Sequence, residues 1–265
     1  MPRLIGWHLG AGAARRVGRR VRHILLHALL LAAPLAQADG WSGAIGLSSD
    51  QVLRGVSQSQ GQAGLTLDAS HRSDTGWALG LGASTLGRDG AGRPSLLTAS
   101  LGRHWQLDAD WAAQLGAAHY AYPGPLQRRR YDYDELLATV GWQGRLAASL
   151  AVSPNTTRPN TARPAAPQPG APAPFSQGRA LAWELSLHQR LQGRLALDAG
   201  LGYFDLHALR GQPAAGYPYA SVALGWGVGP VQGFVSVIGS RAAQRRLAQA
   251  GAAGERGLLS VVWDF

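Results

Sequence analysis

From Trp41 to the end of the chain, apolar side chains alternate with polar or small ones at every second position, the period of a β-strand and not of a helix. Residues 181–189 place Leu, Trp, Leu and Leu on one face and Ala, Glu, Ser and His on the other. Residues 194–203 repeat the pattern with Leu, Ala and Tyr against small residues and an Asp. The apolar face of such a strand contacts either a sandwich core or membrane lipid. Small and polar residues opposite it are typical of a barrel interior.

The alternation predicts twelve strands. Each has about nine to fourteen residues, enough to cross a bilayer at a tilt of about 45°. The predicted strands are residues 41–49, 61–71, 76–86, 95–106, 109–122, 130–142, 145–153, 180–191, 194–205, 217–227, 231–240 and 256–265.

The connections between these strands alternate in length. The tight ones are residues 73–75, 107–108, 143–144, 192–193 and 227–230. The long ones are residues 50–60, 87–94, 123–129, 154–179, 206–216 and 241–255. An even strand number with short turns at one end and long loops at the other indicates an outer-membrane barrel, because a soluble sandwich has no reason to sort its loops in this way. We therefore expect an all-β fold, a 12-stranded antiparallel transmembrane β-barrel with short periplasmic turns, long outer loops and an extended or disordered proline-rich loop at 154–179.

Aromatic residues gather near the predicted strand ends. Amphipathic rings favour the headgroup level of a membrane, so these residues are expected to form its girdles. They are Trp77, Trp105, Trp111, Trp142, Trp183, Trp226, Tyr120, Tyr122, Tyr131, Tyr133, Tyr203, Tyr217 and Tyr219.

The first 38 residues have the order of a secretory signal peptide. Residues 1–22 hold six arginines and no acid, residues 24–35 form a short apolar run, and Ala36-Gln37-Ala38 supplies a small-x-small cleavage site. As a membrane anchor the apolar run is too short, since twelve helical residues reach roughly 18 Å and a bilayer core is about 30 Å thick. Residues 1–38 are therefore expected to be removed, leaving 39–265 as the barrel in the cell outer membrane.

The last strand carries a second targeting signal. Val261, Trp263 and Phe265 share one face with Leu259, whereas Arg256, Ser260 and Asp264 share the other. A terminal strand of this kind that ends on Phe is similar to the signal that the outer-membrane assembly machinery reads, and that machinery is an expected partner.

The composition excludes several kinds of functional site. The chain has no cysteine, which excludes a disulfide framework and cysteine-based metal or catalytic sites. The net charge of +10 falls to about +4 without the signal peptide, and no nucleotide or nucleic-acid motif is present. Most of the remaining arginines fall in the outer loops and predict a basic outer mouth, represented by Arg241, Arg245 and Arg246. Such a mouth would concentrate small anions or bind the phosphates of surrounding lipopolysaccharide.

One segment resembles a known family. Residues 49–59 (SDQVLRGVSQS) resemble the opening signature of the TorF family of porins, and residues 65–77 fit the strand, turn and strand that follow it. Gln51 stands where the family has an aromatic residue, and Ala63-Gly64 stands where it has Pro-Ala. The resemblance covers about 45 residues and implies a porin-like barrel. Its motif residues here are Ser49, Asp50, Arg54, Gly55, Ser57 and Gln58.

Arg54 and Gly55 lie where the first strand meets its outer loop. An arginine beside a flexible glycine can tie such a loop to a carboxylate inside the mouth, and Asp50 or Asp68 is the expected partner. The pair is interpreted either as a structural anchor of the loop or as part of a constriction that contacts solute.

Four further residues are predicted to line the lumen: Asp68, Glu184, His188 and Asp198. Glu184, Ser186 and His188 share one face of a strand and superficially resemble a hydrolase triad. Alternate residues on a strand are about 6.6 Å apart, however, so hydrogen bonds between them need long side chains or neighbours. No nucleophile elbow and no cluster with metal-ligand spacing accompanies them. A polar lining is therefore favoured over catalysis, and neither a metal nor a cofactor is expected.

The sequence thus favours an outer-membrane porin-like barrel for passive diffusion of small polar solutes, with anions preferred if the basic mouth dominates. Two alternatives remain open. One is a non-conducting structural or adhesive barrel that acts through residues 154–179. The other is a barrel hydrolase that uses Glu184, Ser186 and His188.

Overall fold

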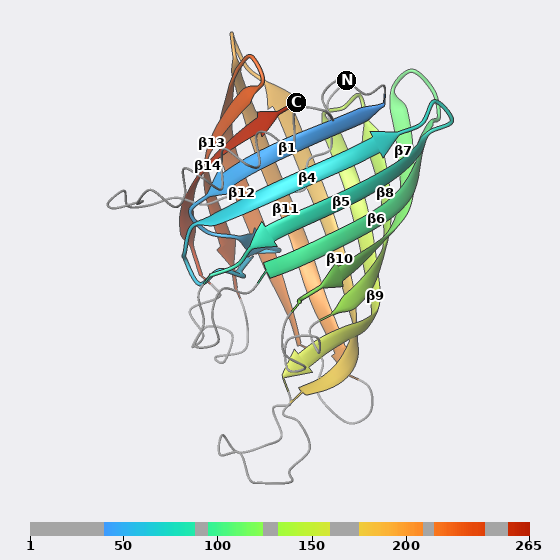
Figure 1. Ribbon diagram of the computed structural model, residues 1–265, viewed down its shortest axis with the longest axis vertical. Helices are drawn as coiled ribbons and strands as arrows, with labels where there is room; N and C mark the ends of the chain where they lie inside the picture. Colours follow the sequence, from blue (N-terminus) through green and yellow to red (C-terminus); the bar gives the residue numbers. More distant parts are fainter. Residues whose placement is uncertain (1–39, 88–94, 124–131, 160–174, 209–214, 242–253) are drawn as a thin grey trace, which may run out of the picture.

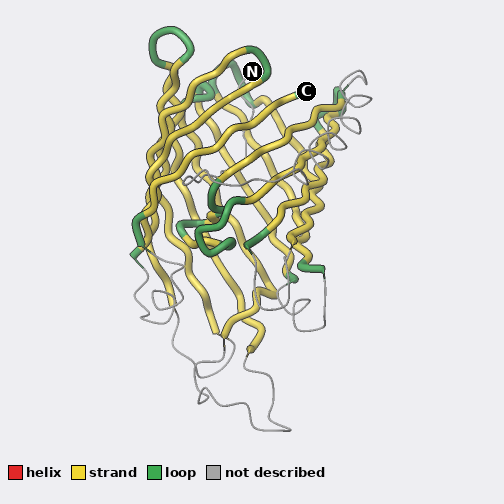
Figure 2. The backbone as a smooth tube through the Cα atoms, turned by 60° about the vertical axis from the view of Figure 1, so that its left-hand side comes forward, coloured by secondary structure: helices red, strands yellow, loops and turns green. Residues whose placement is uncertain are grey.

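A computed structural model describes residues 40–87, 95–123, 132–159, 175–208, 215–241 and 254–265. Its strands form one closed antiparallel barrel and one separate two-stranded hairpin (Figures 1 and 2). The barrel strands are β1 (Trp41–Ser48), β4 (Gly64–Arg72), β5 (Trp77–Thr85), β6 (Ser95–Gln106), β7 (Trp111–Ala121), β8 (Tyr133–Trp142), β9 (Leu146–Pro159), β10 (Phe175–Arg190), β11 (Leu195–Ala208), β12 (Ala215–Val228), β13 (Val231–Ser240) and β14 (Arg256–Asp264). The hairpin consists of β2 (Val52–Leu53) and β3 (Val56–Ser57).

Each barrel strand pairs with its neighbours in the chain, and β1 closes the ring. Ala44 on β1 lies opposite Asp264 on β14 and opposite Asp68 on β4. The predicted 12-stranded antiparallel barrel is therefore confirmed. In the described part of the chain, no helix is long and apolar enough to cross a membrane.

The short connections all lie at the end of the barrel that also holds the start of β1 and the end of β14, as Figure 1 shows. Glycines at positive φ, such as Gly144, Gly193 and Gly229, make these tight turns without the steric cost that a Cβ would bring. The strand ends that the long connections join lie at the opposite end. The predicted sorting of loop lengths between the two ends is thus present in the structure.

The proline-rich loop is shorter than predicted. Strand β9 continues to Pro159 and β10 already begins at Phe175, so Arg179 belongs to a strand and only residues 160–174 remain, outside the described residues. These extensions lack the apolar alternation because a wall that rises beyond the lipid is held by backbone hydrogen bonds and needs no apolar outer face.

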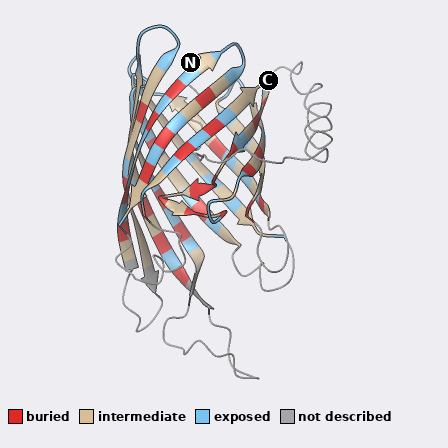
Figure 3. Ribbon diagram, turned by 90° about the vertical axis from the view of Figure 1, so that its left-hand side faces the viewer, coloured by how far each residue is buried: buried red, intermediate tan, exposed pale blue. Residues whose placement is uncertain are grey.

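The two faces of the wall differ in chemistry. Outward positions carry exposed apolar side chains, including Leu115 at 56% and Leu136 at 60% exposure. Inward positions are small, polar or buried, so less exposed and more exposed residues alternate along most of the wall in Figure 3. An apolar outer surface around a polar interior is the arrangement of a transmembrane barrel. The space enclosed by this wall is called the lumen below.

The aromatic residues do not all form girdles. Trp41, Trp77, Trp111 and Trp226 are exposed near the turn end, as a girdle requires. Trp183 lies in the middle of β10, because that strand begins earlier than predicted.

The prediction is wrong for several tyrosines, because their register turns them into the lumen. Tyr217 and Tyr219 are buried inside the wall, and Tyr120 stacks on Tyr133 with 4.4 Å between ring centroids. Tyr131 lies outside the described residues.

The terminal strand has the predicted alternation. Leu259 and Val261 are exposed on the outer face, whereas Leu258 and Ser260 are buried inside. Phe265 follows β14 and exchanges two backbone hydrogen bonds with Gly43, and its ring contacts that of Trp263. The end of the chain is therefore part of the strand pairing that closes the barrel.

Candidate constriction hairpin

The chain turns into the lumen directly after β1 and forms the hairpin of β2 and β3. Val52 pairs with Ser57 and Leu53 with Val56, which leaves Arg54 and Gly55 as a two-residue turn. Both turn residues have positive φ, 49° for Arg54 and 77° for Gly55, as in the tight turns that suit the twist of a hairpin. A left-handed conformation is unusual for arginine, so contacts around the tip must hold it there. We call residues 49–62 the constriction hairpin.

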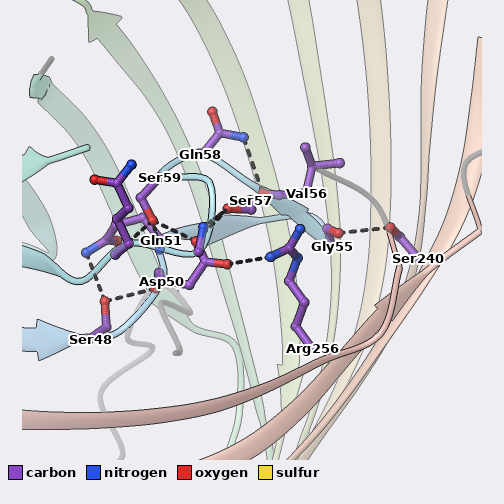
Figure 4. A network of polar contacts seen from close by, with 12 residues as sticks. Ser48, Asp50, Gln51, Gly55, Val56, Ser57, Gln58, Ser59, Ser240 and Arg256 are labelled. Carbon is purple, nitrogen blue, oxygen red and sulfur yellow. Dashed lines mark hydrogen bonds and ion pairs between the residues drawn. The ribbon is translucent and has the colours of Figure 1, made fainter. Parts of the chain in front are cut away.

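The base of the constriction hairpin is built around Asp50, whose side chain is almost fully buried. Figure 4 shows the hydroxyl groups of Ser57 and Ser59 donating to its Oδ1, while Arg256 on β14 approaches its Oδ2 at 3.2 Å. The backbone N–H of Gln51 donates to the Ser59 hydroxyl at 2.8 Å. One carboxylate therefore joins both arms of the hairpin to the barrel wall.

Gln51 fastens the hairpin to the β1 side of the barrel. Its amide nitrogen donates to the hydroxyls of Ser48 on β1 and Thr66 on β4. A buried amide fills this position, where the TorF signature has an aromatic residue. Hydrogen bonds to these inward hydroxyls satisfy the nitrogen of the Gln51 amide, whereas its Oε1 is buried without a partner among the described residues.

The hairpin tip contacts the wall at β13 and β12, two and three strands around the barrel from β1. Ser240 on β13 donates to the carbonyl of Gly55 at 2.8 Å. A Cβ at Gly55 would lie 2.7 Å from the Cβ of Ser240 and 2.8 Å from that of Tyr219, so only glycine fits. Gly55 is needed here for close approach as well as for its positive φ.

Arg54 reaches from the tip to β8. Its Nη2 lies 2.8 Å from both carboxylate oxygens of Glu135, and the guanidinium stands over the ring of Phe204 at 5.3 Å. Burial alone would lower the pKa of Arg54, but the Glu135 carboxylate outweighs it, so the pKa is raised and the side chain stays charged. The Arg54–Glu135 pair ties the hairpin tip to β8. This strand lies four places around the wall from β12, which the tip also contacts.

Apolar packing holds one face of the hairpin. Val52 is 2% exposed and packs with Ala223, Ile238 and Leu258, with Phe234 beside them. These residues come from β12, β13 and β14, so the hairpin covers that side of the lumen. The inward positions of β4 to β7 are instead mostly small, including Gly80, Gly82, Ser100, Gly102 and Gly116. The hairpin therefore narrows the lumen asymmetrically.

The four predicted lumen residues all occupy inward positions. Asp68 lies on β4 beside Gly82, and Glu184 accepts a hydrogen bond from the Tyr219 hydroxyl at 2.9 Å. His188 on β10 pairs with Asp198 on β11, its direct neighbour across the two strands.

Glu184, Ser186 and His188 do share one face, but their hydrogen bonds lead elsewhere. Ser186 donates to the carbonyl of Ala147, at 3.5 Å, while Glu184 and His188 have the partners named above. Among the described residues, no three His, Asp or Glu side chains gather where they could hold a metal ion.

The structure describes some of the remaining residues that the sequence singled out and not others. Ser49 has a buried hydroxyl without a partner among the described residues, and the Gln58 amide donates to the Val56 carbonyl. Arg241 is exposed directly after β13. Arg245 and Arg246 lie outside the described residues, so the structure shows one of the three residues that represent the basic mouth.

The partner of Arg54 differs from the prediction. It is Glu135, and neither Asp50, which pairs with Arg256, nor Asp68. Sequence reasoning overlooked Glu135 although it lies in a predicted strand, where it shares the inward face with Tyr133, two residues before it. The role of Ser240 had no sequence signal, because a single serine at a strand end is common.

Comparisons with known proteins concern the fold. No family model and no curated protein matches the chain. Among solved structures, a NanC porin is 9% identical with a TM-score of 0.52, over 84% of this chain and 98% of that one. A KdgM porin in complex with disordered oligogalacturonate is 10% identical with a TM-score of 0.47, over 85% and 99%. The likeness to the NanC porin shows that the fold is that of an outer-membrane porin barrel.

Proposed function

We propose that this protein is an outer-membrane porin that lets small polar solutes diffuse passively, with the constriction hairpin as the narrow part of the path. The observation that carries the proposal is a hairpin anchored on the inside of a closed barrel whose outer face is apolar. A soluble barrel would not expose Leu115, Leu136 and their neighbours. A barrel used only as a membrane anchor has no need of a hairpin that is fastened across its interior by a buried ion pair.

The hairpin also supports membership of the TorF family. The residues that carry the resemblance have definite roles in it, since Asp50 and Ser57 form the base, and Arg54 and Gly55 form the tip. The motif therefore encodes an inward hairpin and not a general loop. Membership predicts the same hairpin in other members of the family.

The route to the membrane completes the proposal. Residues 1–38, all of them outside the described residues, act as a cleaved export signal. The assembly machinery then reads the outward face of β14 with Val261, Trp263 and Phe265, while outer-loop arginines contact lipopolysaccharide. The pairing of Phe265 with Gly43 supports a role for the terminal residue in barrel closure.

The inward polar residues act as lining and not as catalysts in this proposal. Glu184 is engaged by Tyr219, and His188 by Asp198. Neither interaction aligns a base with the Ser186 hydroxyl, which supports a diffusion path without catalysis or cofactor.

Two groups of charged residues have opposing effects on which solutes the diffusion path prefers. Arg241 belongs to the proposed basic mouth, which attracts small anions, whereas Asp68, Glu184 and Asp198 place carboxylates deeper in the lumen. Because a mouth charge acts on every approaching solute, we propose a modest preference for anions.

Liposome swelling tests the function. Vesicles that contain the refolded protein should swell in iso-osmotic solutions of small neutral sugars and amino acids, at rates that fall with solute size. A variant in which residues 52–57 are replaced by a two-residue glycine turn should swell faster and admit larger solutes. If vesicles with the wild type and vesicles with the variant both swell no faster than empty vesicles, the result would support the non-conducting barrel instead.

A further inference from the structure

Arg103 is an arginine on the lipid-facing side of the barrel. It lies on β6, opposite Trp77 on β5 and Leu115 on β7. The outward neighbours Leu101 and Leu115 are 52% and 56% exposed, so Arg103 shares their apolar face. It lies three positions before Gln106, where β6 ends at the end of the barrel that carries the short turns. At about 3.3 Å per residue it lies roughly 10 Å along the strand from that end, a depth close to the headgroup level.

Two tryptophans hold the Arg103 side chain in place. Its guanidinium carbon is 5.6 Å from the ring centroid of Trp77 and 5.4 Å from that of Trp105. Trp77 stands directly across the strand pair, and Trp105 is two residues further along the same face. Both ring faces attract a cation but cannot neutralise it. The rings thus orient the guanidinium without supplying a counter-charge.

No anionic partner reaches Arg103 within the part of the chain that the structure describes. Its Nε is buried without a hydrogen-bond partner. The contrast with the lumen is clear, because Arg54 and Arg256 each face a carboxylate there. An arginine on a lipid-facing surface is tolerated near the interface, where its cost falls to about 0–1 kcal/mol, but costs about 2–4 kcal/mol at the midplane. A phosphate at the interface would complete its coordination.

We propose that Arg103, Trp77 and Trp105 form a binding site for the phosphate of one membrane phospholipid. The guanidinium fork matches two phosphate oxygens, and the exposed leucines beside it provide a surface for the acyl chains. The site lies at the short-turn end, which is the periplasmic side if the protein has the proposed outer-membrane location, and the inference rests on that location. It therefore selects a phospholipid of the inner leaflet.

Native mass spectrometry of the refolded barrel in detergent with added phosphatidylglycerol tests the site. The wild type should retain one phospholipid per barrel, and R103Q should bind it at least about tenfold more weakly, which corresponds to about 1.4 kcal/mol. R145Q is the matched control, because Arg145 lies in an exposed turn at the same end. It removes the same charge and should bind lipid like the wild type.

Two further measurements keep the test decisive. W77L and W105L retain the charge and an apolar outer face, so they should fold as the wild type does and yet bind lipid more weakly. An excess of inorganic phosphate should not displace the lipid, because it lacks acyl chains. Equal lipid binding by R103Q and R145Q would overturn the site, and displacement by inorganic phosphate would overturn its assignment to a phospholipid. A barrel that is found in no membrane fraction would instead overturn the proposed function and this inference with it.

Discussion

Replacing Arg54 with methionine is expected to release the tip of the constriction hairpin. The Arg54 and Glu135 side chains are 16% and 6% exposed. Removal of one partner from such a buried ion pair costs about 3–5 kcal/mol, because the other charge stays buried without compensation. Methionine also keeps the left-handed backbone at this position, which costs about 1–2 kcal/mol, without a contact that stabilises it.

These energies predict a large increase in the population of the released hairpin. Taking the lower value of about 3 kcal/mol, the ratio of released to docked hairpin rises about a hundredfold. The base of the hairpin should remain attached, because Asp50 keeps its bonds to Ser57, Ser59 and Arg256. The tip then moves while the barrel wall stays intact.

Single-channel recording in planar bilayers measures the effect. R54M should show a larger and noisier conductance than the wild type, as should E135Q. R194M, in the short turn between β10 and β11, is the control for the loss of an arginine. In the double variant R54M/E135L the two effects should not add, because no buried charge is left alone. Identical current levels and noise in R54M and R194M would refute the reasoning that this ion pair holds the hairpin.

Three other predictions concern export, assembly and charge. Mass spectrometry of the membrane-extracted protein should find Asp39 or a neighbour as the first residue, and an intact precursor in the outer membrane would overturn the targeting argument. Deletion of Phe265 should reduce outer-membrane assembly much more than Ser260→Ala, which changes the inward face; equal losses would show that the face of the strand is not recognised. Low-salt reversal potentials should show a modest anion preference that falls in Arg241→Glu and at high salt, because the Debye length shrinks from about 30 Å at 0.01 M to about 3 Å at 1 M. A cation preference that disappears in Asp68→Asn would mean that lumen carboxylates dominate.

The fold could be predicted well because its physical rules are local. A strand between lipid and lumen must alternate, as residues 181–189 do, and antiparallel neighbours need turns whose length is readable from the sequence. The same rule explains the misjudged ends of β9 and β10. Beyond the lipid the outer face needs no apolar residues, so the pattern disappears while the backbone pairing continues.

The site was only partly predictable because its contacts are long-range. An arginine beside a glycine after the first strand suggested an anchor, and the structure has one. Its partner Glu135 is 81 residues away and Arg256, the partner of Asp50, is 206 residues from it. Which of several inward carboxylates meets Arg54 depends on how deep the hairpin enters and where the barrel closes. Neither quantity is encoded in local spacing.

The central claim is that the barrel conducts past its hairpin, and planar-bilayer conductance of the refolded wild-type protein tests it most directly. We expect discrete, long-lived current steps in the wild type and larger steps when residues 52–57 are replaced by a short glycine turn. A membrane-inserted wild-type barrel without current steps, in which that replacement also opens no path, would contradict it.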